Sequence, residues 1–175
     1  MKKYHFTGQG KALFLFSVLF SAGLVSCEEN SKDLVKPKTV TDILAENDQF
    51  STLNEIVVGA NAADAFRTEN FTFFAPNNTA FQTANLTSSQ VLAWEKDSIM
   101  SFLKYHVIAP RQTTIELKPQ EYTTLNKHKL TVQKGTDTTI VTINNNARII
   151  QKNINTDGGI IQVINHVLSG IKKVN

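Results

Sequence analysis

The chain has 175 residues, of which 18 are Lys or Arg and 15 are Asp or Glu. Three of the basic residues and none of the acidic ones lie in residues 1–26, so the remainder carries no net charge. This balance excludes a basic nucleic-acid footprint, and the single cysteine, Cys27, excludes an intrachain disulfide.

The start of the chain has the pattern of an export signal. Lys2, Lys3 and Lys11 are followed by the apolar run Ala12–Val25. Its fourteen residues are too few for a membrane-spanning helix, which needs about 20.

The string Leu24–Cys27 resembles a bacterial lipobox, which implies cleavage after Ser26 and a lipid on Cys27. The alternative is a plain signal peptide with an incidental cysteine. We expect a signal peptide over 1–26 and a lipidated, polar tether over 27–36. The acidic pair after the cysteine resembles surface-export signals of Bacteroidota lipoproteins. It implies an outer-membrane location with possible surface exposure, although a solvated linker also explains the pair.

The next segment has helical periodicity. Apolar residues in Val40–Leu44 predict one helix, and those in Phe50–Ala60 predict a second, for which Asp48 or Ser51 is a suitable cap. The alanine-rich stretch Ala60–Phe66 predicts a further turn or two.

The stretch Phe71–Phe81 predicts a strand, a turn and a helix. Its first four residues are aromatic or β-branched, and Pro76, which has no N–H, ends the strand. Asn77 or Asn78 can cap a helix that begins at Thr79. The apolar residues on both sides of the strand predict burial of both of its faces.

Two more helices and a set of strands follow. Thr87 or Ser88 can cap a short helix, and Asp97 can cap a longer one that runs to Val107 and is stopped by Pro110. Alternating residues then predict four strands, and helices early with strands late indicate an α+β domain. The predicted strands are Lys129–Gln133, Thr139–Asn144, Ala147–Gln151 and Ile160–Leu168.

Three strings resemble the fasciclin domain, in the family's order. Phe71–Phe81 resembles its first signature, Leu103–Ile108 its Tyr-His segment and Gly159–Leu168 its second signature. The resemblance implies a single fasciclin domain over 37–175, with a twisted two-sheet β-wedge or sandwich and helices packed along one edge. The matching signature residues are Phe74, Ala75, Pro76, Asn78, Ala80, Phe81, Gly159, Val163, Ile164, Val167 and Leu168.

The sequence departs from the family at several positions, one of which, Gly158-Gly159 in place of the usual Asn-Gly, still supplies a glycine turn. Gln162 stands where the family usually has His, and Asn165 stands where it often has Asp. Some members carry an adhesive Asp-Ile pair before the second signature. The matching pair here, Asn153-Ile154, lacks the carboxylate that a cation-dependent contact needs.

Tyr105 and His106 are the partner-binding candidates. The resemblance links the Tyr-His segment to surface recognition, and the alternative is that both residues only hold the helix against the sheet. The histidines at 106, 128 and 166 form no metal-ligand motif, and no phosphate loop or nucleophile elbow is present. We therefore expect no catalytic residue, metal or cofactor, although a triad assembled in space stays open.

The expected function is adhesion or binding of a protein or glycan by a monomeric, lipid-anchored module of a bacterial envelope. The first alternative is a small-molecule or polysaccharide-capture accessory of a transport system. An enzyme is the third possibility, and a cleft with shifted pKa values would favour it.

Overall fold

The computed structural model of the chain describes residues 37–66 and 70–169. The predicted signal peptide, Cys27 and the tether lie outside the described residues. The helices are α1 (Val40–Glu46), η1 (Asp48–Phe50), α2 (Ser51–Gly59), η2 (Ala63–Phe66), α3 (Asn78–Thr83), α4 (Ser88–Leu92) and α5 (Lys96–Tyr105). The strands are β1 (Phe71–Pro76), β2 (Val107–Ile108), β3 (Glu121–Thr123), β4 (Lys129–Lys134), β5 (Val141–Ile143), β6 (Ala147–Asn155) and β7 (Gly159–Ile164).

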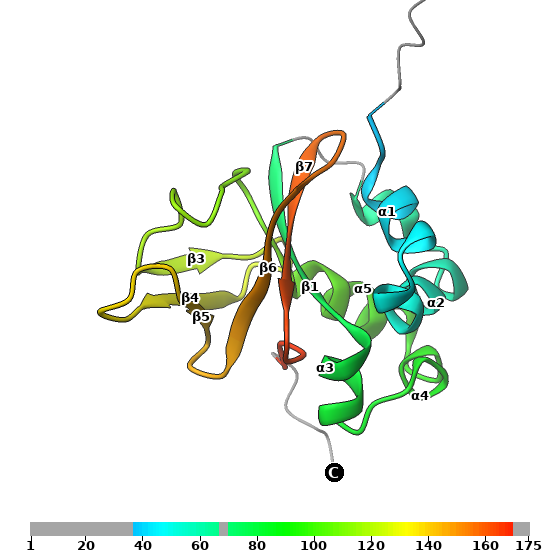
Figure 1. Cartoon of the computed structure of the whole chain (residues 1–175). Helices are drawn as coiled ribbons and strands as arrows, with labels where there is room; N and C mark the ends of the chain where they lie inside the picture. The colour runs from blue at the N-terminus through cyan, green and yellow to red at the C-terminus, as the bar shows by residue number, and fades with distance from the viewer. Residues whose placement is uncertain (1–36, 67–69, 170–175) are drawn as a thin grey trace, which may run out of the picture. The chain divides into compact units, whose positions relative to one another are not determined.

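Strand β1 lies between two hydrophobic cores, as its sequence predicts. Every residue of the strand is buried. Successive side chains of a strand point to opposite faces. Phe71 and Phe73 accordingly join the core under the helices, whereas Phe74 joins the core enclosed by the outer strands. Figure 1 shows the helices gathered on one side of β1 and β7, with β3, β4 and β5 on the other.

The strands form a mixed sheet that closes on itself. The order is β2-β1-β7-β6-β5-β4-β3, with β1 and β7 parallel. The two outermost strands meet, because Ile108 bridges Thr124 and the Leu125 amide donates to the Val107 carbonyl over 2.9 Å. This nearly closed wedge, with helices packed beside β1 and β7, confirms the predicted fold class.

Two of the predicted helix caps are confirmed. The Asn77 side chain accepts the Ala80 amide over 2.9 Å, and α3 begins at Asn78. Thr87 forms a reciprocal capping box with Gln90 at the start of α4. Both caps depend on residues three positions apart, which is why the local sequence predicts them.

Two other cap predictions were wrong. Asn47, not Asp48 or Ser51, caps this region, because η1 runs straight into α2 and moves the first free amides upstream. Glu95 occupies the N-cap position of α5, and Asp97 lies inside its first turn. A carboxylate there still stabilises the positive end of the helix dipole.

The end of α5 and one strand also differ from expectation. The helix ends at Tyr105, and Val107 belongs to β2, which pairs with Thr72 and Phe73 of β1. Strand β3 was not predicted. Strands of two or three residues are too short to show alternation, so only pairing with distant partners defines them.

Candidate functional site

Tyr105 and His106 lie inside the domain at the end of α5. Tyr105 is 6% exposed and His106 is 1% exposed. The Tyr105 hydroxyl donates to the Lys129 carbonyl over 3.1 Å and accepts from Asn144 Nδ2 over 3.0 Å. The phenol therefore links α5 to β4 and to the turn after β5.

The His106 ring links α5 to the segment after β7. Its Nδ1 lies 2.9 Å from the Phe102 carbonyl, and its Nε2 accepts the Leu168 amide over 3.0 Å. This pair of bonds requires a neutral ring with the proton on Nδ1. Burial lowers the pKa of His106 from 6.5 to about 4, against the opposing effect of the Phe102 carbonyl.

These bonds support the structural alternative for the Tyr-His pair. The polar atoms of both rings are used within the domain, and neither ring presents a substantial surface to a partner. Recognition through Tyr105 or His106 stays a prediction for binding experiments.

The signature residues occupy the interior or its border. Gly159 is the position with the tightest steric demand, because a Cβ there would lie 2.7 Å from the Phe71 ring. Asn78 is not the cap of α3. It ties α3 to the start of α2 instead, because its amide donates to the Asp48 carbonyl and accepts from the Thr52 amide. Buried signature residues are Phe74, Ala75, Pro76, Ala80, Phe81, Gly159, Val163, Ile164 and Leu168, while Asn78 and Val167 are half-buried.

Asn153 and Gln162, two positions at which the sequence departs from the family, form one hydrogen-bonded cluster. Gln162 is fully buried, donates to Asn153 Oδ1 over 2.8 Å and accepts the Asn153 amide over 3.0 Å. Asn153 Oδ1 also accepts the Thr114 amide over 2.9 Å. The Asn153 side chain therefore holds the segment between β2 and β3 in place and is not presented to a partner.

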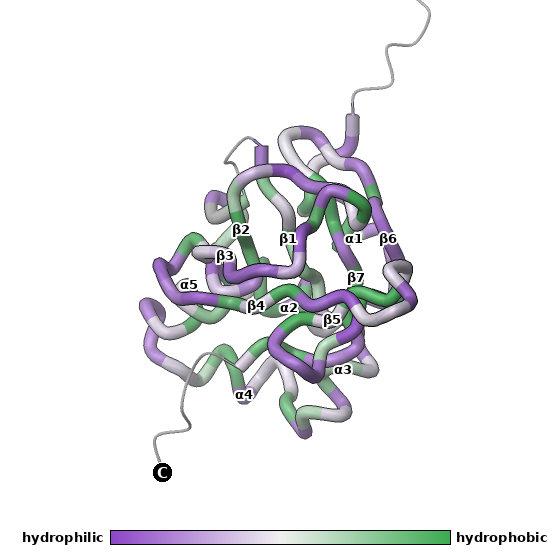
Figure 2. Tube along the Cα trace, turned by 90° about the vertical axis from the view of Figure 1, so that its left-hand side faces the viewer, coloured by the Kyte–Doolittle hydropathy of each residue, from purple (hydrophilic) through white to green (hydrophobic). Residues whose placement is uncertain are grey.

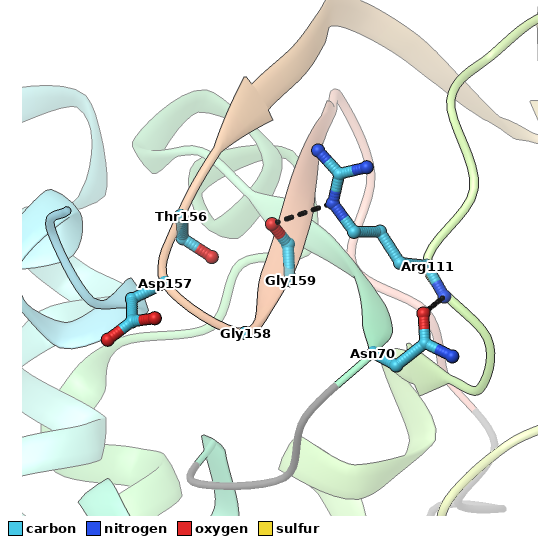
Figure 3. A pocket seen from close by; sticks show the side chains of 6 residues that line it. All are labelled: Asn70, Arg111, Thr156, Asp157, Gly158 and Gly159. Carbon is cyan, nitrogen blue, oxygen red and sulfur yellow. Dashed lines mark hydrogen bonds between the residues drawn. The ribbon is translucent and has the colours of Figure 1, made fainter.

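A polar cavity of about 350 Å³ lies where this segment meets the β6–β7 turn. It is lined by Asn70, Arg111 and the turn Thr156–Gly159 (Figure 3). Sequence reasoning missed it, because its residues come from three separate stretches of the chain. The one local signal was Asp157-Gly158-Gly159, where Gly158 has a φ of 84° that favours glycine.

A second hollow, of about 460 Å³, lies between the helices and β6. His106, Glu116 and Asp137, whose pKa values are clearly shifted, line neither of the two hollows. No cluster of three metal-ligating side chains occurs within residues 37–66 and 70–169. The second hollow is lined by Ile43, Glu46, Asn47, Asp48, Gln151 and Ile154.

Large exposed hydrophobic side chains are scattered over the domain. Val58, Ile115 and Ile150 are 70%, 87% and 52% exposed and lie on α2, on the segment between β2 and β3, and on β6. Figure 2 shows hydrophobic and hydrophilic positions interspersed along the described part of the chain. No helix of the described part is long and apolar enough to cross a bilayer.

The helices and the nearly closed mixed sheet define the class as an α+β domain. The family model of the fasciclin domain matches residues 48–170, and the chain belongs to this family. Protein sll1483 of Synechocystis is 32% identical over 133 residues, which cover 74% of this chain and 72% of that protein.

Fasciclin domains also occur as parts of larger proteins. Mouse Stabilin-2 is 34% identical over 102 residues, which cover 57% of this chain but 4% of Stabilin-2. A solved FAS1 domain pair from the insect cell adhesion molecule fasciclin I shares the fold, with a TM-score of 0.56 and 24% identity. That match covers 70% of this chain and 46% of the insect chain. The domain is thus one that an adhesion molecule uses.

Proposed function

We propose that the protein is an envelope-anchored binding module that recognises a protein or glycan partner and performs no catalysis. The observation that carries this proposal is membership of the fasciclin family, whose domain builds the insect cell adhesion molecule fasciclin I. The polar atoms of Tyr105 and His106 serve the fold, which leaves binding to the outer surface and the hollows.

Anchoring is the second part of the proposal, and it rests on Cys27 in its lipobox-like string. Each buried CH₂ of an acyl chain contributes about 0.8 kcal/mol, and stable anchoring needs more than one chain or a second signal. Cells that express the wild type should incorporate a fatty-acid probe into the protein and retain it in the outer-membrane fraction. Cys27→Ala should do neither, and a variant that is still labelled would refute the lipobox interpretation.

Binding is tested with beads that carry the purified protein. Native beads should capture defined glycans from an array or a specific partner from envelope extracts, and beads with heat-unfolded protein should not. Equal capture by both, or by neither, would refute a folded recognition surface.

A capture accessory for a small molecule or polysaccharide is the second candidate function. The polar cavity beside Arg111 favours it, because such a hollow suits a hydrophilic ligand. Saturable binding of a free mono- or oligosaccharide, together with no retention of cells or proteins on beads, would favour this candidate over adhesion.

A further inference from the structure

The cavity beside Arg111 is lined by polar side chains and glycines alone. It lies at the turn between β6 and β7, next to the start of β1, the strand that runs parallel to β7 (Figures 1 and 3). The Asn70 amide donates to the Gly158 carbonyl over 2.6 Å, which fixes one wall to the turn. A hollow with these side chains suits a hydrated polar ligand better than an apolar one.

The Arg111 guanidinium is held in position by neutral groups. Its Nε donates to the Gly159 carbonyl over 3.4 Å, and its Nη2 donates to Asn155 Oδ1 over 2.7 Å. The Glu116 carboxylate interacts electrostatically with Arg111 but accepts its hydrogen bonds from Thr113, so its oxygens leave the guanidinium N–H groups unoccupied. The guanidinium is therefore oriented before any ligand arrives, and its remaining N–H groups can serve as donors.

Two other features of the wall suit a hydroxylated anion. Thr156 Oγ1 is buried without a hydrogen-bond partner, and its oxygen points toward the space inside the turn (Figure 3). The carboxylate of Asp157 points away from Arg111 in the same view. Gly158 adds no side chain, so a ligand can approach the backbone there, whereas the Phe71 ring fills the corresponding space at Gly159.

We propose that this cavity binds the carboxylate of an acidic sugar, such as a uronic acid unit of a glycan. A planar guanidinium matches a carboxylate through two parallel N–H···O bonds, which neutral sugars do not offer. The sugar hydroxyls would meet the polar wall, including Thr156. This inference rests on the proposed function, since it names the chemical class of the glycan that the module recognises.

The test is calorimetric titration of the purified protein with trigalacturonic acid and with its fully methyl-esterified form, which is only slightly larger and carries no charge. The wild type should bind the acid at least tenfold more tightly than the ester. Arg111→Gln should weaken binding of the acid at least tenfold, because the charged fork is lost. Arg111→Lys keeps the charge but not the planar pair of donors. Its affinity for the acid should lie between those of the wild type and Arg111→Gln.

Arg148→Gln is the matched control, because it removes the same charge from an exposed position on β6 outside the cavity. Its affinity should stay within twofold of the wild type, and circular dichroism should show that all variants are folded. Thr156→Val should weaken binding of the acid and leave the melting temperature unchanged or raised, because it removes an unpaired buried oxygen.

Three results would overturn the inference: no binding of the acid by the wild type, equal affinity for the ester, or an equal loss in Arg148→Gln. Binding of a sulfated trisaccharide but not of the acid would also overturn it and assign the cavity to sulfate. The glycan-array and bead experiments separate the two proposals. If the wild type captures an envelope partner but not the acid, this inference fails and the binding function stands.

Discussion

The buried ring of His106 makes the stability of the domain depend on pH. Burial lowers the pKa of the folded state to about 4, whereas the unfolded chain titrates near 6.5. Between these values the unfolded state binds more protons, so protonation favours unfolding and stability falls as the pH falls. From this difference, His106 alone should cost about 2 kcal/mol at pH 5 and about 3 kcal/mol at pH 4, relative to pH 7.

The hydrogen bonds of the His106 ring also predict that stability falls as the pH falls. A protonated ring has donors on both nitrogens, so Nε2 would face the Leu168 amide donor and lose the bond that holds the segment after β7. The assay is denaturant unfolding at several pH values for the wild type and His106→Gln, which has no titrating group at 106. The advantage of the wild type over the variant should shrink by about 3 kcal/mol between pH 7 and pH 4.

Carboxylates elsewhere in the domain titrate in the same pH range and also change its stability. The test is therefore the difference in free energy of unfolding between the wild type and His106→Gln at each pH. His128→Gln serves as the control, because His128 is exposed. It should show the same pH dependence as the wild type. A wild-type advantage over His106→Gln that stays constant from pH 7 to pH 4 would refute the assignment of a buried neutral ring.

Three further predictions concern the core and the Tyr-His pair. Phe74→Ala should lower the free energy of unfolding by about 3–5 kcal/mol in chemical denaturation, because the ring is fully buried between strands. Gly159→Ala should lower the melting temperature, since its Cβ would lie 2.7 Å from the buried Phe71 ring. The double substitution of Tyr105 to Phe and His106 to Gln should lower stability but leave partner affinity of the folded fraction unchanged, as titration with a partner found on the array would show.

The two core substitutions each have a control in the same chain. Val58→Ala should leave the free energy of unfolding almost unchanged, because Val58 is 70% exposed. Gly135→Ala should be tolerated, since a Cβ there meets nothing within 4 Å. An unaltered melting temperature in Phe74→Ala or Gly159→Ala would contradict the packing around β1. A tenfold loss of affinity in a folded, stable Tyr105–His106 double variant would restore the recognition role.

The strand, turn and helix at Phe71–Phe81 were predictable because their causes are local. Aromatic and β-branched residues favour the strand, Pro76 cannot extend it, and Asn77 reaches an amide three residues away. The same reasoning explains the correct cap at Thr87. It failed at Asp48 and Asp97, where several acceptable caps stand close together and the path of the preceding turn decides among them.

Tertiary structure alone decided three features: the closure of the sheet, the burial of His106 and the cavity beside Arg111. β2 and β3 exist because distant strands and the bridge between Ile108 and Thr124 satisfy their backbone groups, and no periodicity marks them. The burial of His106 depends on a bond to Leu168, 62 positions away. The cavity beside Arg111 forms only when that residue meets Asn70 and the β6–β7 turn, because chain neighbours encode local conformation whereas a cavity depends on which distant segments pack together.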